Sequence, residues 1–448
     1  MTPDTPHILL VNPWIDDFAA YDVWAQPMGL LMLAGLLRKQ GYRLSYLDCL
    51  DRFHPRAPRS DPFARHGRGP YFKTPQPAPP GLEDIPRRFS RYGLHEAWLH
   101  EDLGRQPAPD LILVTSMMTY WYPGVQATIA VLRKAHPTVP IILGGIYATL
   151  CRAHAEQTSG ADHVVPGAID GRLLDVIDRF TGYTSRSAVD LNDVDATPYP
   201  AWDLRRRINY LPILTSLGCP FDCAYCASRF LQPRCRKRQP QAVIDEILFW
   251  HRSSGVRDFV IYDDAFLVDA ESHAGPILEG LIRSGAQLRF HTPNALHIRG
   301  LSPSIADLLA RAGFYTVRLG LETTVRNDRE TYDRKVNLDD FVTAAGCLRN
   351  AGFTPQELGA YLLIGLPGQS IDTVIKSIRL VKTQRIRPIL AYYTPIPHTR
   401  LWAEAVAASR YDLEADPVFS NNAIFPCQSE SFSWENLSQL KAMTRMTV

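Results

Sequence analysis

Short apolar runs alternate with amphipathic segments along the chain, and this alternation is the feature that most constrains the fold. The strand-like runs of the first series are His7–Pro13, Arg43–Cys49, Asp110–Ser116, Pro140–Gly145 and His163–Gly167. Helix-like segments accompany them near residues 28–37, 123–135, 148–158 and 170–180. Short strands without a polar face are typical of a parallel sheet covered by helices on both sides. The first series therefore predicts a doubly wound, Rossmann-like α/β domain over residues 1–190.

A second alternating series follows a turn-rich linker at residues 191–208. Its strand-like runs are 213–217, 259–262, 288–291, 316–319, 358–364 and 389–393, and its helix-like runs are 240–252, 272–284, 303–312, 338–350 and 370–384. Strands that are linked in sequence by helices, without doubling back, favour a barrel or an open part of one. We therefore expect a partial (β/α)6 barrel over residues 209–400.

Two segments do not follow this alternation of strand-like and helix-like runs. Residues 52–109 form a proline-rich insertion in the first domain, too long for an ordinary connection. Its aromatic and basic residues favour an ordered cover over a disordered segment. Residues 401–448 form a C-terminal extension in which we find no motif.

Three cysteines directly follow the first strand of the second series. Cys219, Cys223 and Cys226 have the spacing CxxxCxxC. Soft thiolate ligands select zinc, copper(I) or iron–sulfur clusters. A structural zinc needs four ligands, and Cys235 is close enough in sequence to be the fourth. Three cysteines and one open position instead fit a 4Fe–4S cluster with one iron left for another ligand.

The cysteine motif, with the aromatic Tyr225 immediately before its last cysteine, resembles the signature of the radical S-adenosylmethionine (SAM) superfamily. This resemblance implies that Cys219, Cys223 and Cys226 hold a 4Fe–4S cluster and that the fourth iron chelates SAM. It also implies that the reduced cluster cleaves SAM to a 5′-deoxyadenosyl radical.

Polar residues and turns follow the later strands of the second series, at the rim where βα barrels carry their ligand-binding groups. With Tyr225, the resemblance implies a SAM site formed by Asp263, Asp264, Asn294, Glu322, Gly365 and Pro367. The two aspartates would lie near the SAM amino group, Glu322 near the ribose, and the Gly365–Gly368 turn near the adenine or methionine end. Alternatives stay open: the aspartates could cap a helix, and Glu322 could pair with Arg318.

A doubly wound sheet binds ligands beyond its strand carboxyl ends, where the strand order reverses. In a 2-1-3-4-5 sheet that edge carries Asn12, Trp14, Ser116, Gly144 and Gly145. The first domain contains neither GxGxxG nor a P-loop, which removes the main support for dinucleotide or nucleoside-triphosphate binding.

The domain order resembles the cobalamin-binding class of radical SAM proteins, which implies that these five residues bind cobalamin. The cobalamin motif DxHxxG is missing, and the nearest string, Asp162–Gly167, has the wrong spacing. The resemblance therefore implies cobalamin held without a protein imidazole, or a Rossmann-like domain without cobalamin.

The combined resemblance implies a radical SAM enzyme, and most specifically a cobalamin-dependent methyltransferase acting on an unactivated carbon of an unidentified substrate. A second hypothesis keeps the radical chemistry but ends in rearrangement, cyclisation or oxidation. A third is a non-catalytic metal-binding regulatory protein. The enzyme hypotheses imply a small-molecule or lipid-like substrate and an external electron donor such as flavodoxin or ferredoxin.

Charge and hydropathy narrow the remaining choices. Lys and Arg total 48 against 46 Asp and Glu, a net charge of +2, so charge gives little support to a nucleic-acid partner. No apolar run approaches the ~20 residues that span a bilayer. The first residues lack the pattern of a secretory signal. We therefore expect a cytoplasmic protein without a transmembrane segment.

Overall fold

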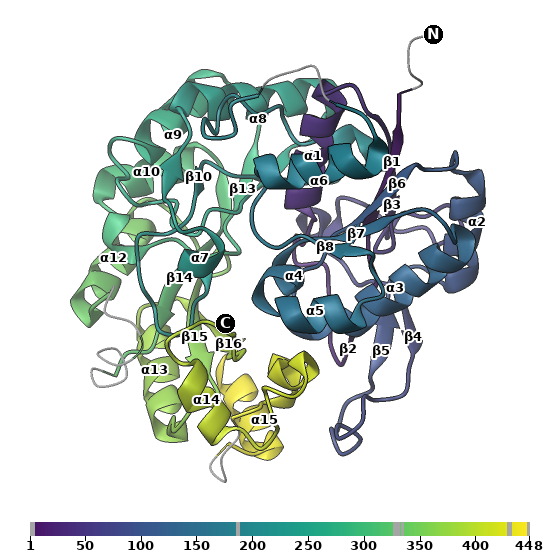
Figure 1. Ribbon diagram of the computed structural model, residues 1–448. Coiled ribbons are helices and arrows are strands. Elements are labelled where there is room, and N and C mark those ends of the chain that lie inside the picture. The colour runs from purple at the N-terminus through teal and green to yellow at the C-terminus, as the bar shows by residue number, and fades with distance from the viewer. Residues whose placement is uncertain (1–4, 185–188, 326–331, 333–335, 428–431, 446–448) are drawn as a thin grey trace. The chain divides into compact units, whose positions relative to one another are not determined.

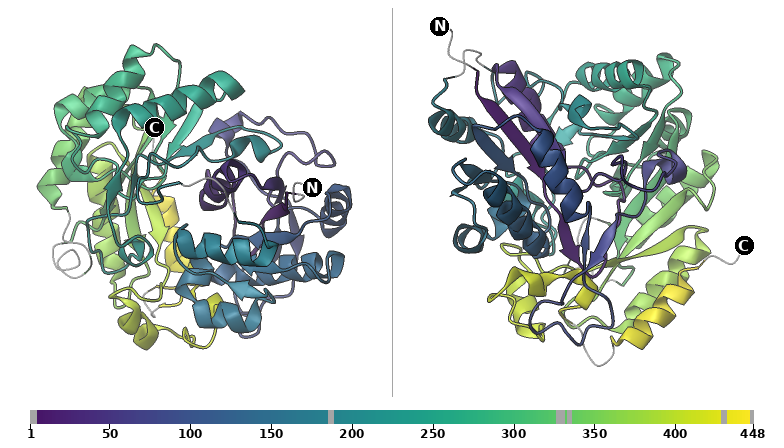
Figure 2. Two further views of the ribbon diagram at one scale, coloured as in Figure 1. Left: turned by 45° about the horizontal axis from the view of Figure 1, so that its top comes forward. Right: turned by 90° about the vertical axis from the view of Figure 1, so that its right-hand side faces the viewer.

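The chain divides into two units in the computed structural model, which describes residues 5–184, 189–325, 332, 336–427 and 432–445 (Figures 1 and 2). Unit 1 comprises Met1–Asn209 and Ala415–Phe419. Unit 2 comprises Tyr210–Glu414 and Ser420–Val448. A short C-terminal segment therefore belongs to the N-terminal unit.

Unit 1 is built on a five-stranded parallel sheet in the order β3-β1-β6-β7-β8. The strands are β1 (His7–Asn12), β3 (Arg43–Asp48), β6 (Leu111–Val114), β7 (Ile141–Leu143) and β8 (His163–Val164). This is the 2-1-3-4-5 order expected from the sequence, and the doubly wound fold is confirmed.

Helices cover both faces of the unit 1 sheet because alternate residues of β1 enter different cores. Ile8 and Leu10 pack in the core formed with α1 and α6, whereas Leu9 and Val11 pack with α2, α3, α4 and α5. The helices are α1 (Met28–Lys39), α2 (Glu96–Arg105), α3 (Tyr122–Ala135), α4 (Ile146–Leu150), α5 (Arg152–Thr158) and α6 (Gly171–Thr181). The strand periodicity of two produces these two layers.

The proline-rich insertion contributes two strands to a small antiparallel sheet in the order β2-β5-β4. Its strands are β2 (Ile15–Asp17), β4 (Lys73–Pro75) and β5 (Ser90–Tyr92). Arg91 on β5 forms an ion pair with Asp16 on β2 at 2.8 Å and lies over the Trp14 ring at 4.7 Å. These strands and α2 were not expected from the sequence. Residues 52–109 thus contain β4, β5 and α2.

Unit 2 is built on a six-stranded parallel sheet in the order β16-β15-β14-β13-β12-β9. The strands are β9 (Leu211–Ile213), β12 (Asp258–Ile261), β13 (Arg289–His291), β14 (Phe314–Glu322), β15 (Leu358–Ile364) and β16 (Arg387–Tyr392). The helices between them are α8 (Pro240–Ser254), α9 (Ala274–Arg283), α10 (Pro303–Arg311), α12 (Leu338–Asn350) and α13 (Ile371–Thr383). The strand order follows the sequence order, as a partial barrel requires, so the second fold prediction is confirmed.

The first strand of this series differs from its expected range of 213–217. The parallel strand ends at Ile213, and Ser216–Leu217 form β10, which pairs antiparallel with β11 (Arg236–Lys237). The ladder stops because the amide of Thr215 donates to a side chain, Asp263, instead of continuing the sheet.

The C-terminal extension contains α14 (Trp402–Ala408) and α15 (Trp434–Met443). The remaining short elements are η1 (Ala64–Gly67), η2 (Thr119–Trp121), η3 (Trp202–Leu204), α7 (Ser228–Leu231), η4 (Ile298–Gly300), η5 (Pro417–Ser420) and η6 (Asn422–Ile424). Within the described residues, no helix is both long and apolar enough to cross a membrane.

Candidate functional site

The three cysteines lie on one loop, residues 218–235, which we call the cysteine loop. The β10–β11 hairpin closes it, with Leu217 opposite Arg236. Gly218 begins the loop with a φ of 78°, and a Cβ there would lie 2.9 Å from the carbonyl oxygen of Arg234. The two ends of the loop therefore approach each other as closely as glycine allows.

Asp263, at the end of β12, holds the base of the cysteine loop. Its carboxylate accepts hydrogen bonds from the amide of Thr215 at 2.8 Å, the Thr215 hydroxyl at 2.6 Å and the Ser216 hydroxyl at 2.6 Å. Burial raises the pKa of this carboxyl, and the Ser216 and Thr215 hydrogen bonds oppose the rise. The side chain is buried, so Asp263 acts on the loop from beneath it.

The middle of the cysteine loop is fixed through Ala224. Its amide donates to the carbonyl of Tyr332 at 3.0 Å, and its carbonyl accepts from the amide of Leu401 at 2.9 Å. Arg400 adds a hydrogen bond to the carbonyl of Asp222 at 2.6 Å and an ion pair with its carboxylate at 3.2 Å. The backbone between the second and third cysteines is thus held from two later parts of unit 2.

The cysteines of this loop form no disulfide, and they differ in solvent exposure. Cys219 and Cys223 are half-buried, whereas Cys226 is exposed. The amide of Cys226 donates to the carbonyl of Cys223 at 3.1 Å, which turns the chain between them. Tyr225 is half-buried, and Cys235, the alternative fourth ligand, is exposed immediately before β11. Three thiols on one fixed loop suit a soft metal or an iron–sulfur cluster.

Asp264 and Asn294 are exposed at the ends of neighbouring strands. Asp264 accepts a hydrogen bond from Ser228 in the cysteine loop. The Asn294 amide donates to the carbonyl of Tyr262 at 2.7 Å, which connects the end of β13 to that of β12. Both side chains lie at the same strand-end edge as the cysteine loop.

Glu322 ends β14 in a strained conformation. Its φ is 63°, unusual for a residue with a side chain, and the β14–β15 register shifts between Gly320 and Glu322. Such outliers and bulges concentrate at functional sites. Arg318, the pairing alternative, donates to the carbonyls of Val317 and Glu357, both at 3.0 Å.

The turn after β15 carries Gly365 and Pro367, both buried. The Gly365 amide donates to Gln369 Oε1 at 2.9 Å, and the Pro367 carbonyl accepts from the Tyr332 hydroxyl at 3.0 Å. The backbone carbonyl of Tyr332 also accepts a hydrogen bond from the amide of Ala224. One tyrosine therefore connects this turn to the cysteine loop.

The sequence analysis missed two aromatic–imidazole stacks beside the cysteine loop. Phe221 stacks on His297 at 4.2 Å, and Phe230 stacks on His398 at 4.1 Å between ring centroids. His398 is exposed with a φ of 68°. Each pair joins the loop to a residue that follows a later strand. The two partners of a pair are far apart in sequence, so the sequence alone does not reveal the contact.

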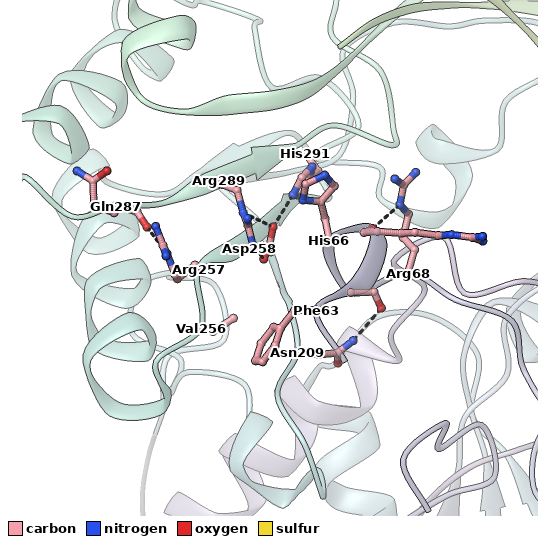
Figure 3. A network of polar contacts seen from close by, with 12 residues as sticks. Phe63, His66, Arg68, Asn209, Val256, Arg257, Asp258, Gln287, Arg289 and His291 are labelled. Carbon is pink, nitrogen blue, oxygen red and sulfur yellow. Dashed lines mark hydrogen bonds and ion pairs between the residues drawn. The ribbon is translucent and has the colours of Figure 1, made fainter. Parts of the chain in front are cut away.

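A buried charge network lies at the opposite, amino-terminal end of the strands (Figure 3). Asp258 begins β12, and its carboxylate accepts from His291 Nε2 at 3.0 Å and from Arg289 at 2.8 and 2.5 Å. Burial would raise the pKa of Asp258, but the His291 and Arg289 hydrogen bonds outweigh it, so the pKa is lowered. These hydrogen bonds connect the neighbouring strands β12 and β13 through their side chains.

In unit 1, Ser116 and Gly145 lock the ends of β6 and β7 together. The Ser116 hydroxyl donates to the carbonyl of Gly144 at 2.7 Å, and its carbonyl accepts from the amide of Ile146 at 2.8 Å. Gly145 has a φ of 97°, and a Cβ there would overlap the Ser116 backbone. Gly145 is therefore required by this close approach.

Asn12 and Asp48 end the neighbouring strands β1 and β3. The Asn12 amide donates to Asp48 Oδ1 at 2.7 Å, and both residues line a small polar pocket with Arg205. Burial, with a further contribution from Asp51, raises the pKa of Asp48 to about 6.

Trp14, one of the five residues expected to contact cobalamin, is buried. Its side chain is 1% exposed, and its indole Nε1 donates to the carbonyl of Leu94 at 2.8 Å. The expected cobalamin contact from Trp14 does not fit this position, because packing against the insertion leaves its ring no exposed face.

Two apolar residues at the unit 1 edge were missed. Met118 follows β6 and is 41% exposed, and Ile146 follows β7 and is 37% exposed. Exposed apolar groups beside a polar, backbone-lined edge are typical of ligand-binding surfaces. Their position directly after strand ends is the sequence signal that could have identified them.

Comparisons with known proteins agree with this architecture. Residues 213–381 match the model of the radical SAM superfamily. Cytidylyl-2-hydroxyethylphosphonate methyltransferase of Streptomyces wedmorensis is 23% identical, over 82% of this chain and 75% of its own. An uncharacterized methyltransferase of Pyrococcus horikoshii is 25% identical over 48% of each chain, so this chain spans about half of that relative. An anaerobic magnesium-protoporphyrin IX monomethyl ester cyclase of Cereibacter sphaeroides is 22% identical, over 68% of this chain and 55% of its own.

Solved structures share the fold of both units. The radical SAM methyltransferase TsrM from Kitasatospora setae, with cobalamin and a 4Fe–4S cluster bound, has a TM-score of 0.64 at 18% identity, covering 91% of this chain and 76% of its own. The cobalamin-dependent SAM radical enzyme OxsB has a TM-score of 0.57 at 14% identity, covering 93% of this chain and 57% of its own. Residues 213–381 thus match the radical SAM superfamily, and the chain shares its fold with a solved radical SAM methyltransferase.

Proposed function

We propose that the protein is a cobalamin-dependent radical SAM methyltransferase that acts on an unactivated carbon of a small-molecule or lipid-like substrate. The observation that carries the proposal is the cysteine loop, fixed by Asp263 and Ala224 at the strand-end edge of unit 2. Two methyltransferases among the relatives, and a methyltransferase structure with both cofactors bound, support the methyl-transfer part.

The thiolates of Cys219, Cys223 and Cys226 would hold the 4Fe–4S cluster. When bound, the cluster supplies the electron that cleaves SAM to a 5′-deoxyadenosyl radical. The loop's role is to keep the three sulfurs in place while leaving an open coordination position. Its anchoring at both ends and in the middle supports this role. An external electron donor such as flavodoxin or ferredoxin would reduce the cluster.

The SAM site would be formed by residues at the same edge of the sheet. Asp264 and Asn294 offer exposed polar groups, and Glu322 offers a carboxylate that accepts hydrogen bonds from ribose hydroxyls. Tyr225 and the turn containing Gly365 and Pro367 would line the adenine or methionine end. Asp263, which has its carboxylate engaged by Thr215 and Ser216, would position the loop and not touch SAM.

Cobalamin would bind at the strand-end edge of unit 1. The half-buried Gly144 and Gly145 would line the site, positioned by the buried Ser116, beside the exposed side chains of Met118 and Ile146. Such a surface accommodates a broad ring through apolar contact and hydrogen bonds, without an imidazole beneath it. When bound, cobalamin supplies the methyl group that is transferred.

The test is anaerobic turnover of cluster-reconstituted protein with SAM and a strong reductant, with and without added cobalamin. We expect 5′-deoxyadenosine in both reactions and S-adenosylhomocysteine only with cobalamin, quantified by mass spectrometry. Cys226→Ala should lose cluster absorbance and both products. Cys235→Ala is the matched control and should keep them. Protein that holds an intact cluster but forms neither product would contradict the proposal.

A second candidate is radical cyclisation or oxidation without methyl transfer, which the similarity to the magnesium-protoporphyrin ester cyclase favours. It predicts 5′-deoxyadenosine without S-adenosylhomocysteine, whether or not cobalamin is present. A four-cysteine zinc site would instead make Cys235→Ala as damaging to metal content as Cys226→Ala. The same experiment therefore separates these alternatives.

A further inference from the structure

Ser228 lies between the third cysteine and an acidic residue of the neighbouring strand end. It is the first residue of α7, two positions after Cys226. Its Oγ is 3.3 Å from Cys226 Sγ, where the thiol donates, and its amide donates to the same sulfur at 3.5 Å. Its hydroxyl also hydrogen-bonds the carboxylate of Asp264. Sulfur, hydroxyl and carboxylate thus form one chain of contacts.

A serine hydroxyl has a single proton to donate. While Cys226 is a thiol, it can donate to Ser228 Oγ, which in turn donates to Asp264. Once Cys226 is a metal-bound thiolate it is only an acceptor, and so is the Asp264 carboxylate. The single hydroxyl proton then has two acceptors, whereas the Ser228 amide keeps its hydrogen bond to the sulfur in either case.

We propose that Asp264 and Cys226 compete for the Ser228 hydroxyl proton, and that this competition tunes the reduction potential of the iron–sulfur cluster. The inference rests on the proposed function, because it assumes that Cys226 is a cluster ligand. Hydrogen bonds to cluster sulfurs stabilise the negative charge added on reduction and raise the potential. By drawing the proton away, Asp264 holds the potential lower. Ser228 and Asp264 are positioning residues here.

Removing the hydroxyl should lower the potential. In Ser228→Ala the sulfur keeps only its amide donor, and we expect about a tenfold lower ratio of reduced to oxidised cluster at a fixed solution potential, about 59 mV for a one-electron couple. Ser228→Thr retains the hydroxyl and should restore the wild-type value. Ser253→Ala, on α8 with its hydroxyl directed at the Trp250 carbonyl, is the matched control.

Changing the competing acceptor should shift the potential in the opposite direction. In Asp264→Asn the side-chain amide can donate to Ser228 Oγ, which frees the hydroxyl proton for the sulfur and raises the potential. The loss of the Asp264 charge also raises it, so the double variant Ser228→Ala/Asp264→Asn is needed. If Asp264 acts through Ser228, the rise in reduction potential caused by Asp264→Asn should be smaller in the Ser228→Ala background.

The measurement is an anaerobic potentiometric titration without SAM, followed by electron paramagnetic resonance of the reduced cluster, with iron content and thermal unfolding recorded for each variant. Opposite shifts that are not additive support the inference. An unchanged potential in Ser228→Ala, or an Asp264→Asn shift that persists in full without the hydroxyl, overturns it. If Ser228→Ala does not hold a cluster, Ser228→Gly, which also lacks the hydroxyl, replaces it in both the single and the double variant. Wild-type protein that assembles no cluster refutes the proposed function instead.

Discussion

The carboxylate of Asp263 accepts hydrogen bonds from both the amide and the hydroxyl of Thr215, at 2.8 and 2.6 Å. The two residues follow adjacent parallel strands, β12 and β9. A side chain thus takes the place of the next ladder partner, ends the strand and starts the cysteine loop. A buried carboxylate is costly unless hydrogen-bonded, and here the hydrogen bonds that stabilise it also fix the loop.

Replacing this anchor should affect stability and cluster content together. Asp263→Ala leaves three buried donors of Thr215 and Ser216 without their acceptor, and we expect a loss of about 3 kcal/mol in the free energy of unfolding. Iron content after reconstitution should fall as the loop loosens. Urea unfolding and iron analysis measure the two effects. Asp339→Ala, at an exposed aspartate in the first turn of α12, serves as control. A variant with wild-type stability and iron would refute the anchoring role.

Two adjacent glycines at the unit 1 edge should respond differently to a single added carbon. A Cβ at Gly145 would overlap the Ser116 backbone at a φ of 97°, so Gly145→Ala should cost about 2 kcal/mol and weaken cobalamin retention. At Gly144 the nearest atom to a Cβ is 3.6 Å away, and Gly144→Ala should be nearly neutral in stability. Thermal unfolding and the absorbance of retained cobalamin distinguish them. Equal effects would show that the close approach does not matter.

The Asp258 network predicts a loss of stability in acid. Because the pKa of Asp258 is lowered by its hydrogen bonds with His291 and Arg289, its contribution is present above the unfolded-state pKa of about 3.9 and is lost as the pH falls through the folded value. Asp258→Asn should cost about 3 kcal/mol at pH 7, since it leaves the buried His291 and the partly exposed Arg289 without their anion. The difference in the free energy of unfolding between Asp258→Asn and wild type should narrow toward pH 3. A constant difference across urea titrations at both pH values would contradict this.

The raised pKa of Asp48 predicts a pH dependence of stability opposite to that of Asp258. Its pKa is raised to about 6, so the folded state binds the proton more tightly than the unfolded chain does. Its contribution to stability therefore declines as the pH rises from about 4 to about 6. Asp48→Asn should remove this decline and stabilise the protein by about 1 kcal/mol at pH 7. The unfolding midpoint measured from pH 4 to 7 checks it, and a less stable variant at pH 7 would refute it.

Both parallel sheets were predictable because their signal is local. Most strands of the two series are short apolar runs, such as Leu111–Val114, and the intervening helices carry their own periodicity. Parallel strands linked by helices also allow few arrangements, so the order of strands follows from their sequence. Sequence analysis thus identified the edge at which the cysteine loop and its neighbours lie.

The insertion escaped prediction because its pairing is not local. Tyr92 pairs with both Ile15 and Lys73, and neither partner lies in a run that reads as a strand. The same limit applies to the site. Trp14 follows a strand end, where we expected a contact with cobalamin, yet contacts with Arg91 and Leu94 far along the chain bury it. Ser228 carries no motif and becomes notable only through its contacts with Cys226 and Asp264.

The return of Ala415–Phe419 to unit 1 has a consequence for how this protein can be divided. Within that segment, Asp416 accepts a hydrogen bond from the Tyr122 hydroxyl at 2.8 Å, and Phe419 lies beside Gly81. The N-terminal unit is therefore completed by residues that follow most of unit 2 in the chain. Gene fusion or recombination at residue 209 would separate the first unit from part of its own packing. A fragment that ends at residue 209 should therefore lack the contacts that Asp416 and Phe419 make with unit 1, although it keeps the whole of the first sheet.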